Sequence, residues 1–238
     1  MCGALRLSGL LYIPTVTLRP LCITLAHGFT ASKESMDGLA GYLVRRGFTC
    51  LTFDFRGHKL GASEGKMLSA GDVTEDMLAA AKECMRLCGM EHVVLAGHSM
   101  GCLAAISAAV RLPETVGVVV IATGTKPAKS FKSIVGAAML HQREDYVCGA
   151  PAITLLEEMS TLAEGLSGLG SLSSLFVAAR GDVLVRTARM QEMAAKAGER
   201  AEYSEVDGQH MDAPSRARNV VALWLERLLL TVEGVAAR

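Results

Sequence analysis

The chain has 238 residues, of which 50% are hydrophobic and 20% are charged, a composition that excludes a disordered or fibrous protein. It carries 24 lysines and arginines against 24 aspartates and glutamates, and this balance gives no general attraction to nucleic acid or to an anionic membrane. No stretch of about 18 or more uncharged apolar residues occurs, so we expect no membrane-spanning segment.

Short, continuously apolar runs recur along the chain and predict strands buried on both faces of a parallel sheet. These runs are Leu21–Ala26, Phe48–Phe53, His92–Ala96, Val116–Ala122 and Ser174–Ala179. An antiparallel edge strand is predicted over Leu5–Ile13. The apolar residues there are interrupted by Gly9, which does not fit the layout of a signal peptide.

Helical stretches separate these runs. They are Glu34–Arg46, Thr74–Leu87, Met100–Arg111, Arg186–Ala197 and Pro214 to about Leu230. Gly47 and Gly198 stand where a left-handed C-terminal cap is expected, and Pro214 suits a first helical turn. The alternation of strands and helices predicts an α/β fold with a mostly parallel, doubly wound sheet, as a single domain over residues 1–238.

One segment, at about 125–172, is longer than a crossover between two strands requires. It contains a predicted helix from Pro151 to about Leu162, followed by a stretch rich in glycine and serine. Because structureless loops of this length are uncommon, we expect a small helical cap over the carboxyl edge of the sheet. Its lysines either form a solvated helix face or contact a substrate carboxylate or phosphate. They are Lys126, Lys129 and Lys132.

The cysteines are odd in number and scattered, with no CxxC pair and no histidine doublet beside them. They are Cys2, Cys22, Cys50, Cys84, Cys88, Cys102 and Cys148. Cys84 and Cys88 lie one helical turn apart, but two ligands are too few for a zinc site. We therefore expect free thiols in a reducing compartment, a cytoplasmic location and no metal.

The strongest chemical signal is the G-x-S-x-G pattern of Gly97–Gly101. It follows the apolar residues Val93–Ala96 and opens an alanine-rich helix, which is the strand–turn–helix context that the pattern requires. Such a turn holds the serine in a strained conformation, and the glycines remove side chains that would clash there. Ser99 is therefore the predicted nucleophile.

A serine nucleophile needs a base, and six histidines compete for that role. For this pattern the chain order is serine, acid, histidine, and only His210 follows the last predicted strand. The others precede Ser99, lie beside it or fall in the expected cap: His27, His58, His92, His98 and His141. His210 is the predicted base, with a core or surface role as the alternative.

The predicted acid is Asp182, which comes just after the apolar residues Phe176–Ala179. Asp207 and Asp212 are nearer to the histidine in the chain, but they share its loop and are poorly placed to support the ring from behind. Asp145, in the expected cap, is a third candidate. A plain turn aspartate is the alternative interpretation of Asp182.

Acyl transfer also needs donors for the developing oxyanion. One is the backbone amide of Met100, the residue after the predicted nucleophile. The other is expected in the loop after Leu21–Ala26, where Gly28 lets the backbone turn sharply and leaves the amide of Phe29 facing the site.

These residues together resemble the α/β-hydrolase superfamily over nearly the whole chain. Within it the sequence looks most like small bacterial-type carboxylesterases, including cinnamoyl or feruloyl esterases, which share the H-G-F-T of His27–Thr30. Asp54–His58 and Gly61–Gly65 resemble the family's D-x-R-G-H-G-x-S loop, which borders the active site in relatives. Lys59 and Leu60 look like a two-residue insertion in it, which leaves the shape of the pocket open and the three predicted catalytic residues unaffected. Relatives often have glycine where this chain has Cys102, which is small enough for close helix–strand packing and which we expect to be a tolerated variant.

The resemblance implies a serine hydrolase that cleaves carboxylic esters of small apolar or aryl acyl groups through an acyl-enzyme, without cofactor or metal. The expected partner is a small-molecule ester, and the oligomeric state is left open. A thioesterase, an amidase, a carbon–carbon bond hydrolase or an acyltransferase would use the same residues. A non-catalytic binding protein on a hydrolase fold is the alternative from another class.

Overall fold

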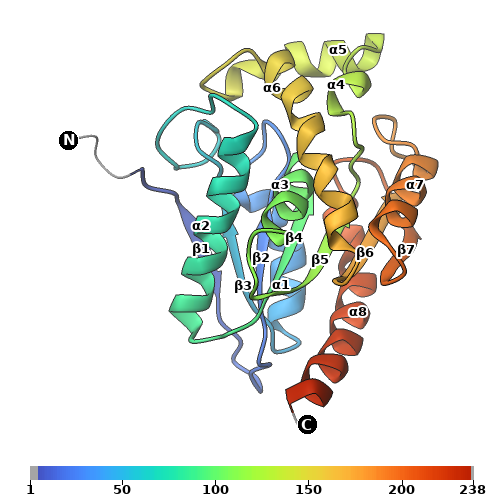
Figure 1. Cartoon of the computed structure of the whole chain (residues 1–238). Helices are drawn as coiled ribbons and strands as arrows, with labels where there is room; N and C mark the ends of the chain where they lie inside the picture. Colours follow the sequence, from blue (N-terminus) through green and yellow to red (C-terminus); the bar gives the residue numbers. More distant parts are fainter. Residues whose placement is uncertain (1–4, 237–238) are drawn as a thin grey trace.

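A seven-stranded sheet forms the centre of the molecule in this computed structural model, which describes residues 5–236 and their side chains up to residue 231 (Figure 1). The strands are β1 (Gly9–Tyr12), β2 (Cys22–Ala26), β3 (Thr49–Phe53), β4 (Val93–His98), β5 (Thr115–Ile121), β6 (Ser173–Ala179) and β7 (Ala201–Val206). Their order in the sheet is β1-β3-β2-β4-β5-β6-β7. β1 runs antiparallel to β3, and all other neighbours are parallel.

The predicted α/β fold with a mostly parallel sheet is confirmed. Every residue of β2, β3 and β4 is buried, as their continuous apolar sequences predict for strands covered on both faces. β7 is an additional strand that the apolar runs did not reveal. Its sequence, Ala-Glu-Tyr-Ser-Glu-Val, belongs to an edge strand in which only Val206 is buried.

Helices cover both faces of the sheet. α2 (Gly71–Cys88), α3 (Met100–Ala109) and α7 (Thr187–Ala197) pack on one face. On the other face, α1 (Asp37–Val44), which follows the 3₁₀ turn η1 (Lys33–Met36), packs beside α8 (Ala213–Ala236). Figure 1 shows these two helical layers with the sheet between them. Among the described helices, none combines the length and the apolar character that crossing a bilayer requires.

Two glycines predicted as helix caps both have positive φ angles. Gly47 has φ +92°, where a side chain would overlap the carbonyl of Thr17. Gly198 has φ +108° and ψ −174°, which lies outside the left-handed helical region, so the prediction of a left-handed cap there was wrong. A left-handed cap does occur at the end of another helix: Gly89, which follows α2, has φ +65° and ψ +31°.

The long connection between β5 and β6 is largely helical. It contains α4 (Pro127–Ser130), α5 (Ile134–His141), η2 (Glu144–Tyr146), α6 (Ala152–Glu158) and η3 (Met159–Leu169). The stretch rich in glycine and serine is thus part of a helix, and its buried Leu166 and Leu169 pack into the core on the α3 side of the sheet. In Figure 1, α4, α5 and α6 lie above the carboxyl edge of the sheet.

Strand register brings the loops with the predicted site residues together. Ala26 at the end of β2 pairs with Gly97 of β4, so the loop after β2 begins beside the turn that holds Ser99. Ala179 at the end of β6 pairs with Val206 at the end of β7, so the two loops that follow start side by side.

Candidate active site

The turn between β4 and α3 holds Ser99 in an unusual backbone conformation, with φ +52° and ψ −117°. A Cβ on Gly97 would overlap the backbone of Gly101, and a Cβ on Gly101 would overlap the carbonyl of Ala26. The Ser99 amide donates to the carbonyl of Ile121 at 3.0 Å, which fixes the turn against β5. Only glycine fits on either side of the serine because the strand and the helix approach so closely.

Ser99, His210 and Asp182 form one chain of hydrogen bonds. The Ser99 hydroxyl lies 3.1 Å from Nε2 of His210, and Nδ1 of His210 lies 2.7 Å from Oδ2 of Asp182. Oδ1 of Asp182 accepts from the amides of Leu184 and Val185, at 2.8 Å and 2.9 Å. The carboxylate is thereby fixed, and it favours the tautomer in which Nδ1 donates to Asp182 and Nε2 accepts from Ser99.

The other carboxylates weighed from the sequence are engaged elsewhere or exposed. Asp207 accepts from Arg180 at 2.7 Å, and Asp212 accepts from the amide of Gln209. Asp145 is exposed in the helical connection. The structure therefore brings Asp182 to His210 and directs these three side chains to other partners or to solvent.

Phe29 and Met100 line a cavity that also contains Ser99 and His210. A Cβ on Gly28 would lie 3.2 Å from Cβ of Ser99, which shows how closely the loop after β2 approaches the serine. In the part of the chain that the structure describes, neither the Phe29 nor the Met100 amide donates to a backbone acceptor.

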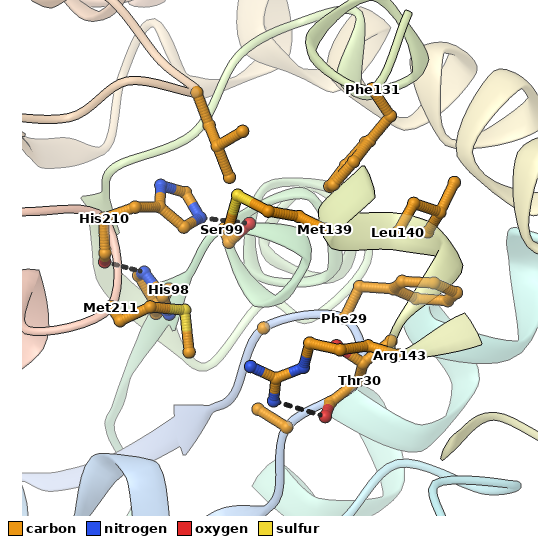
Figure 2. Close-up of a pocket in the computed structure, with 13 residues that line it drawn as sticks. Phe29, Thr30, His98, Ser99, Phe131, Met139, Leu140, Arg143, His210 and Met211 are labelled. Carbon is orange, nitrogen blue, oxygen red and sulfur yellow. Dashed lines mark hydrogen bonds between the residues drawn. The ribbon is translucent and has the colours of Figure 1, made fainter. Parts of the chain in front are cut away.

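A second, larger cavity opens beside the same serine and is lined mainly by apolar side chains (Figure 2). Its apolar lining consists of Phe29, Ala31, Phe131, Met139, Leu140, Leu184 and Met211. Arg143 also lines it, and the sequence analysis did not single out this residue. Phe131, Met139, Leu140 and Arg143 come from the helical connection, so that segment forms one wall of the cavity.

Comparison with known proteins places the chain in a family. Residues 20–144, slightly more than half of the chain, match the family described as serine aminopeptidase, S33. The chain belongs to this family of α/β-hydrolases. No curated protein sequence matches this hydrolase.

Solved structures of α/β-hydrolases resemble it over nearly their full lengths. An esterase from Pyrococcus furiosus is 19% identical with a TM-score of 0.72, covering 94% of this chain and 91% of its own. A thermophilic esterase from Thermogutta terrifontis is 18% identical with a TM-score of 0.69, covering 95% of both chains. The enol-lactonase from Burkholderia xenovorans is 18% identical with a TM-score of 0.67, covering 94% of this chain and 98% of its own. At such identities the likeness shows the fold and leaves the reaction to the site.

His98 supports the hydrolase's His210 from behind. Its Nε2 lies 2.8 Å from the carbonyl of His210, and burial lowers the pKa of His98 to about 3. A neutral His98 therefore donates its Nε2 proton to that carbonyl and fixes the loop that carries His210. Sequence reasoning missed this role because the two residues meet only in the folded chain.

His27 holds the loop after β2. Its Nδ1 donates to the carbonyl of Gly28 at 2.8 Å, and its Nε2 accepts from the amide of Phe55 at 3.1 Å. Burial lowers the pKa of His27 to about 4, so the ring stays neutral and keeps both bonds.

The loop after β3 is built on a buried ion pair. Asp54 is fully buried and accepts from Nζ of Lys33 at 2.6 Å and from the amide of Ala62 at 2.9 Å. The inserted Lys59 and Leu60 are exposed and line neither cavity beside Ser99, although the Lys59 amide donates to the carbonyl of Tyr146 in the helical connection at 2.8 Å.

The lysines of the helical connection do not reach the serine. Within the described side chains, none of the three lines either cavity beside Ser99. Lys132 pairs with Glu157 at 3.3 Å on the surface, and Lys126 lines a separate, open hollow. These lysines therefore fit the interpretation of a solvated helix face, and none of them contacts the cavities beside the serine.

Three thiols gather at the opposite edge of the sheet from Ser99. The sulfurs of Cys22, Cys84 and Cys88 all lie within 4.8 Å of one another, and they are the only group of three or more such ligands among the described residues. The sequence pairs only Cys84 and Cys88, which are one helical turn apart. Cys22 lies on β2 and comes close to them only when α2 packs against that strand. A structural zinc site takes four ligands, one more than this cluster offers.

The cysteine beside the serine turn is a packing residue. Cys102 is fully buried, its Sγ lies 3.0 Å from the carbonyl of Gly97, and burial raises the pKa of its thiol. A protonated, enclosed thiol is unreactive, in agreement with the predicted packing variant. Cys2, the first of the predicted free thiols, lies outside the described residues.

Proposed function

We propose that this hydrolase cleaves carboxylic esters of small molecules through an acyl-enzyme formed on Ser99. The observation that carries the proposal is the chain of hydrogen bonds from Asp182 through His210 to Ser99, at 2.7 Å and 3.1 Å, which ends at a cavity lined by apolar side chains. A serine hydroxyl held against an imidazole that a carboxylate orients is the arrangement that acyl transfer requires.

In the first half of the reaction, His210 accepts the proton of Ser99 while the serine oxygen attacks the ester carbonyl. The alcohol then leaves with the proton from His210, and an acyl group remains on Ser99. In the second half, His210 takes a proton from water, which attacks the acyl-enzyme, and then gives that proton to the Ser99 oxygen as the acid leaves. Asp182 holds the ring in its productive tautomer throughout.

The proposed oxyanion donors are the amides of Phe29 and Met100. Both residues line the cavity around Ser99, and neither amide has a backbone acceptor in the described part of the chain. Removing a single donor of this kind costs roughly 3–4 kcal/mol in the transition state.

The substrate class follows from the walls of the cavities. We assign residues 125–172 as a cap on a single α/β domain, because its side chains supply much of the apolar lining. A lining of phenylalanine, methionine and leucine favours a small apolar or aryl group beside the scissile bond.

Cleavage of peptides at a free amino terminus, which the family description names, fits this site less well. An aminopeptidase must hold a substrate ammonium close to the scissile bond, and a carboxylate would do so. Among the described side chains that line the two cavities beside Ser99, none is acidic, and Arg143 would repel an ammonium. Thioesters and carbon–carbon bonds remain candidates that the same three residues could cleave.

The test is the Ser99→Ala variant, assayed with p-nitrophenyl butyrate and with a fluorescent organophosphonate that labels active serines. We expect turnover and labelling to disappear, whereas Ser167→Ala, which changes an exposed serine of η3, should retain both. Full activity of the Ser99 variant would refute the proposal. A panel of thioesters and diketones, assayed alongside, would show whether the ester is the preferred substrate.

A further inference from the structure

Arg143 places a permanent positive charge inside an otherwise uncharged cavity. A guanidinium stays protonated at any physiological pH. Among the described residues that line the larger cavity beside Ser99, Arg143 is the only lysine, arginine, aspartate or glutamate. Figure 2 shows its guanidinium next to Thr30, on the opposite side of the cavity from Phe131 in this view.

Beyond the Tyr146 ring, whose centroid lies 6.0 Å from the guanidinium carbon, the protein supplies little to balance this charge. No ion pair between described side chains includes Arg143, although its neighbour Glu144 is paired with His141. One guanidinium nitrogen, Nη2, donates to the carbonyl of Thr30 at 3.1 Å. Nε is buried and has no hydrogen-bond partner in the described part of the chain. A guanidinium that lines a cavity without a counter-ion and with an unpaired donor points to an acceptor that arrives with a ligand.

From this geometry we infer that Arg143 binds a carboxylate of the substrate. The inference rests on the proposed function, since it assigns the cavity beside Ser99 to the substrate. A guanidinium is a planar fork of donors that matches the two oxygens of a carboxylate, and their pairing is strongest where water is excluded. The substrate class is thus an ester or lactone with a carboxylate beyond the scissile bond, such as a half-ester of a dicarboxylic acid.

A carboxylate fits better than a phosphate because of the charge available. A phosphate monoester is close to a dianion at neutral pH. The described lining holds one guanidinium and no lysine, and the three lysines of residues 125–172 lie outside the cavity. One positive charge in apolar surroundings matches a single negative charge.

The alternative role of Arg143 is a purely structural one. Its bond to the Thr30 carbonyl ties the segment around η2 to the loop after β2, and the loss of that tie would disturb the site for every substrate. The two roles differ in one measurable respect. A tie affects neutral and anionic esters equally, whereas a carboxylate contact affects only the anionic ones.

The experiment compares kcat/KM for two matched pairs of esters. Mono-p-nitrophenyl succinate against p-nitrophenyl butyrate places the carboxylate on the acyl side. 4-Carboxyphenyl butyrate against phenyl butyrate places it on the alcohol side. In the wild-type protein we expect a preference for the anionic member of one pair. Arg143→Gln should reduce that preference about 10- to 100-fold, in addition to any loss from the missing Thr30 tie that neutral and anionic esters share.

Two further variants control for charge and geometry. Arg143→Lys keeps the charge without the planar fork and should restore part of the preference. Lys132→Gln removes a positive charge from the same segment outside the cavity and should leave the preference intact. No anionic preference in either pair, or equal losses for anionic and neutral esters in Arg143→Gln, would overturn the inference.

A binding measurement separates this inference from the proposed function. Glutarate is titrated by calorimetry into Ser99→Ala and into Ser99→Ala combined with Arg143→Gln, and neither measurement requires turnover. Binding lost only with the arginine supports the carboxylate site even if no ester is hydrolysed. If glutarate binds both variants equally, or binds neither, the carboxylate site is rejected. The proposed function is still supported in that case, provided that ester hydrolysis depends on Ser99.

Discussion

At the scale of single residues, the site depends on a backbone conformation that side chains rarely adopt. Ser99 has φ +52° and ψ −117°, and such a residue costs roughly 1–3 kcal/mol, which the surrounding structure must offset. Its amide bonds to the carbonyl of Ile121, and its own carbonyl accepts from the amide of Cys102 at 3.1 Å. The strain holds the hydroxyl at the carboxyl edge of the sheet, within 3.1 Å of His210.

A methyl group at Gly101 tests this packing. Gly101→Ala would drive its Cβ into the backbone carbonyl of Ala26, so β2 and α3 would have to separate. We expect a loss of roughly 1–3 kcal/mol in the free energy of unfolding, measured in urea, together with a fall in ester hydrolysis. Gly41→Ala is the matched control, because a Cβ there meets only Nη1 of Arg45, at 3.8 Å, and lies away from both cavities beside Ser99. Equal stability of the two variants would contradict the packing argument.

At the scale of elements, buried polar contacts hold the loop after β3 in place. The loop after β3 is anchored by Asp54, which accepts from both the amide and Nζ of Lys33 at the start of η1. The same carboxylate accepts from Ala62 across the loop, and Ser63 donates to the carbonyl of Asp54 at 2.6 Å. The geometry of this loop requires the charge of the carboxylate to be compensated inside the protein.

Removing the buried cation should therefore be costly. In Lys33→Met, the fully buried Asp54 loses its counter-ion while it stays enclosed, and we expect a loss of about 3–5 kcal/mol in the free energy of unfolding. Urea unfolding measures the change. The control is Arg6→Met, which breaks the exposed pair between Arg6 and Glu64 and should leave stability unchanged. A Lys33 variant as stable as the control would show that the pair is not needed.

At the scale of the whole molecule, buried neutral histidines couple folding to pH. Burial lowers the pKa of His27 to about 4, and it lowers the pKa of His58 and of His98 to about 3. In the unfolded chain each imidazole takes up a proton near its ordinary pKa of about 6.5. The stability that these residues contribute is therefore complete above about pH 6.5 and is lost as the pH falls toward 4 and then 3.

The sign and slope of this dependence can be measured. Each buried histidine contributes up to about 1.4 kcal/mol per pH unit, so we expect the free energy of unfolding in urea to fall between about pH 6.5 and about pH 5. His98→Gln removes one titrating group and should make this dependence less steep. His141→Gln changes an exposed histidine and should leave it as it is. A slope that is the same in all three proteins would argue against the buried histidines as its source.

The framework and the order of the site residues could be predicted from local patterns in the chain. Continuous apolar runs predicted β2, β3 and β4 because burial on both faces demands them, and the G-x-S-x-G turn located Ser99 because only glycine fits beside a tight strand–helix junction. Chain order selected Asp182 and His210, which the fold brings within 2.7 Å of each other. β7 was not predicted, because a largely exposed edge strand has no continuous apolar run in its sequence.

Tertiary structure alone decided which distant side chains meet. His98 supports the His210 loop, Cys22 joins Cys84 and Cys88, and Arg143 enters the cavity beside Ser99. None of these contacts leaves a local pattern in the sequence, because each joins elements whose separation along the chain is unrelated to their distance in space. Periodicity and turn chemistry depend on residues that are neighbours in the chain. The packing of helices on the sheet decides which side chains from distant parts of the chain come into contact.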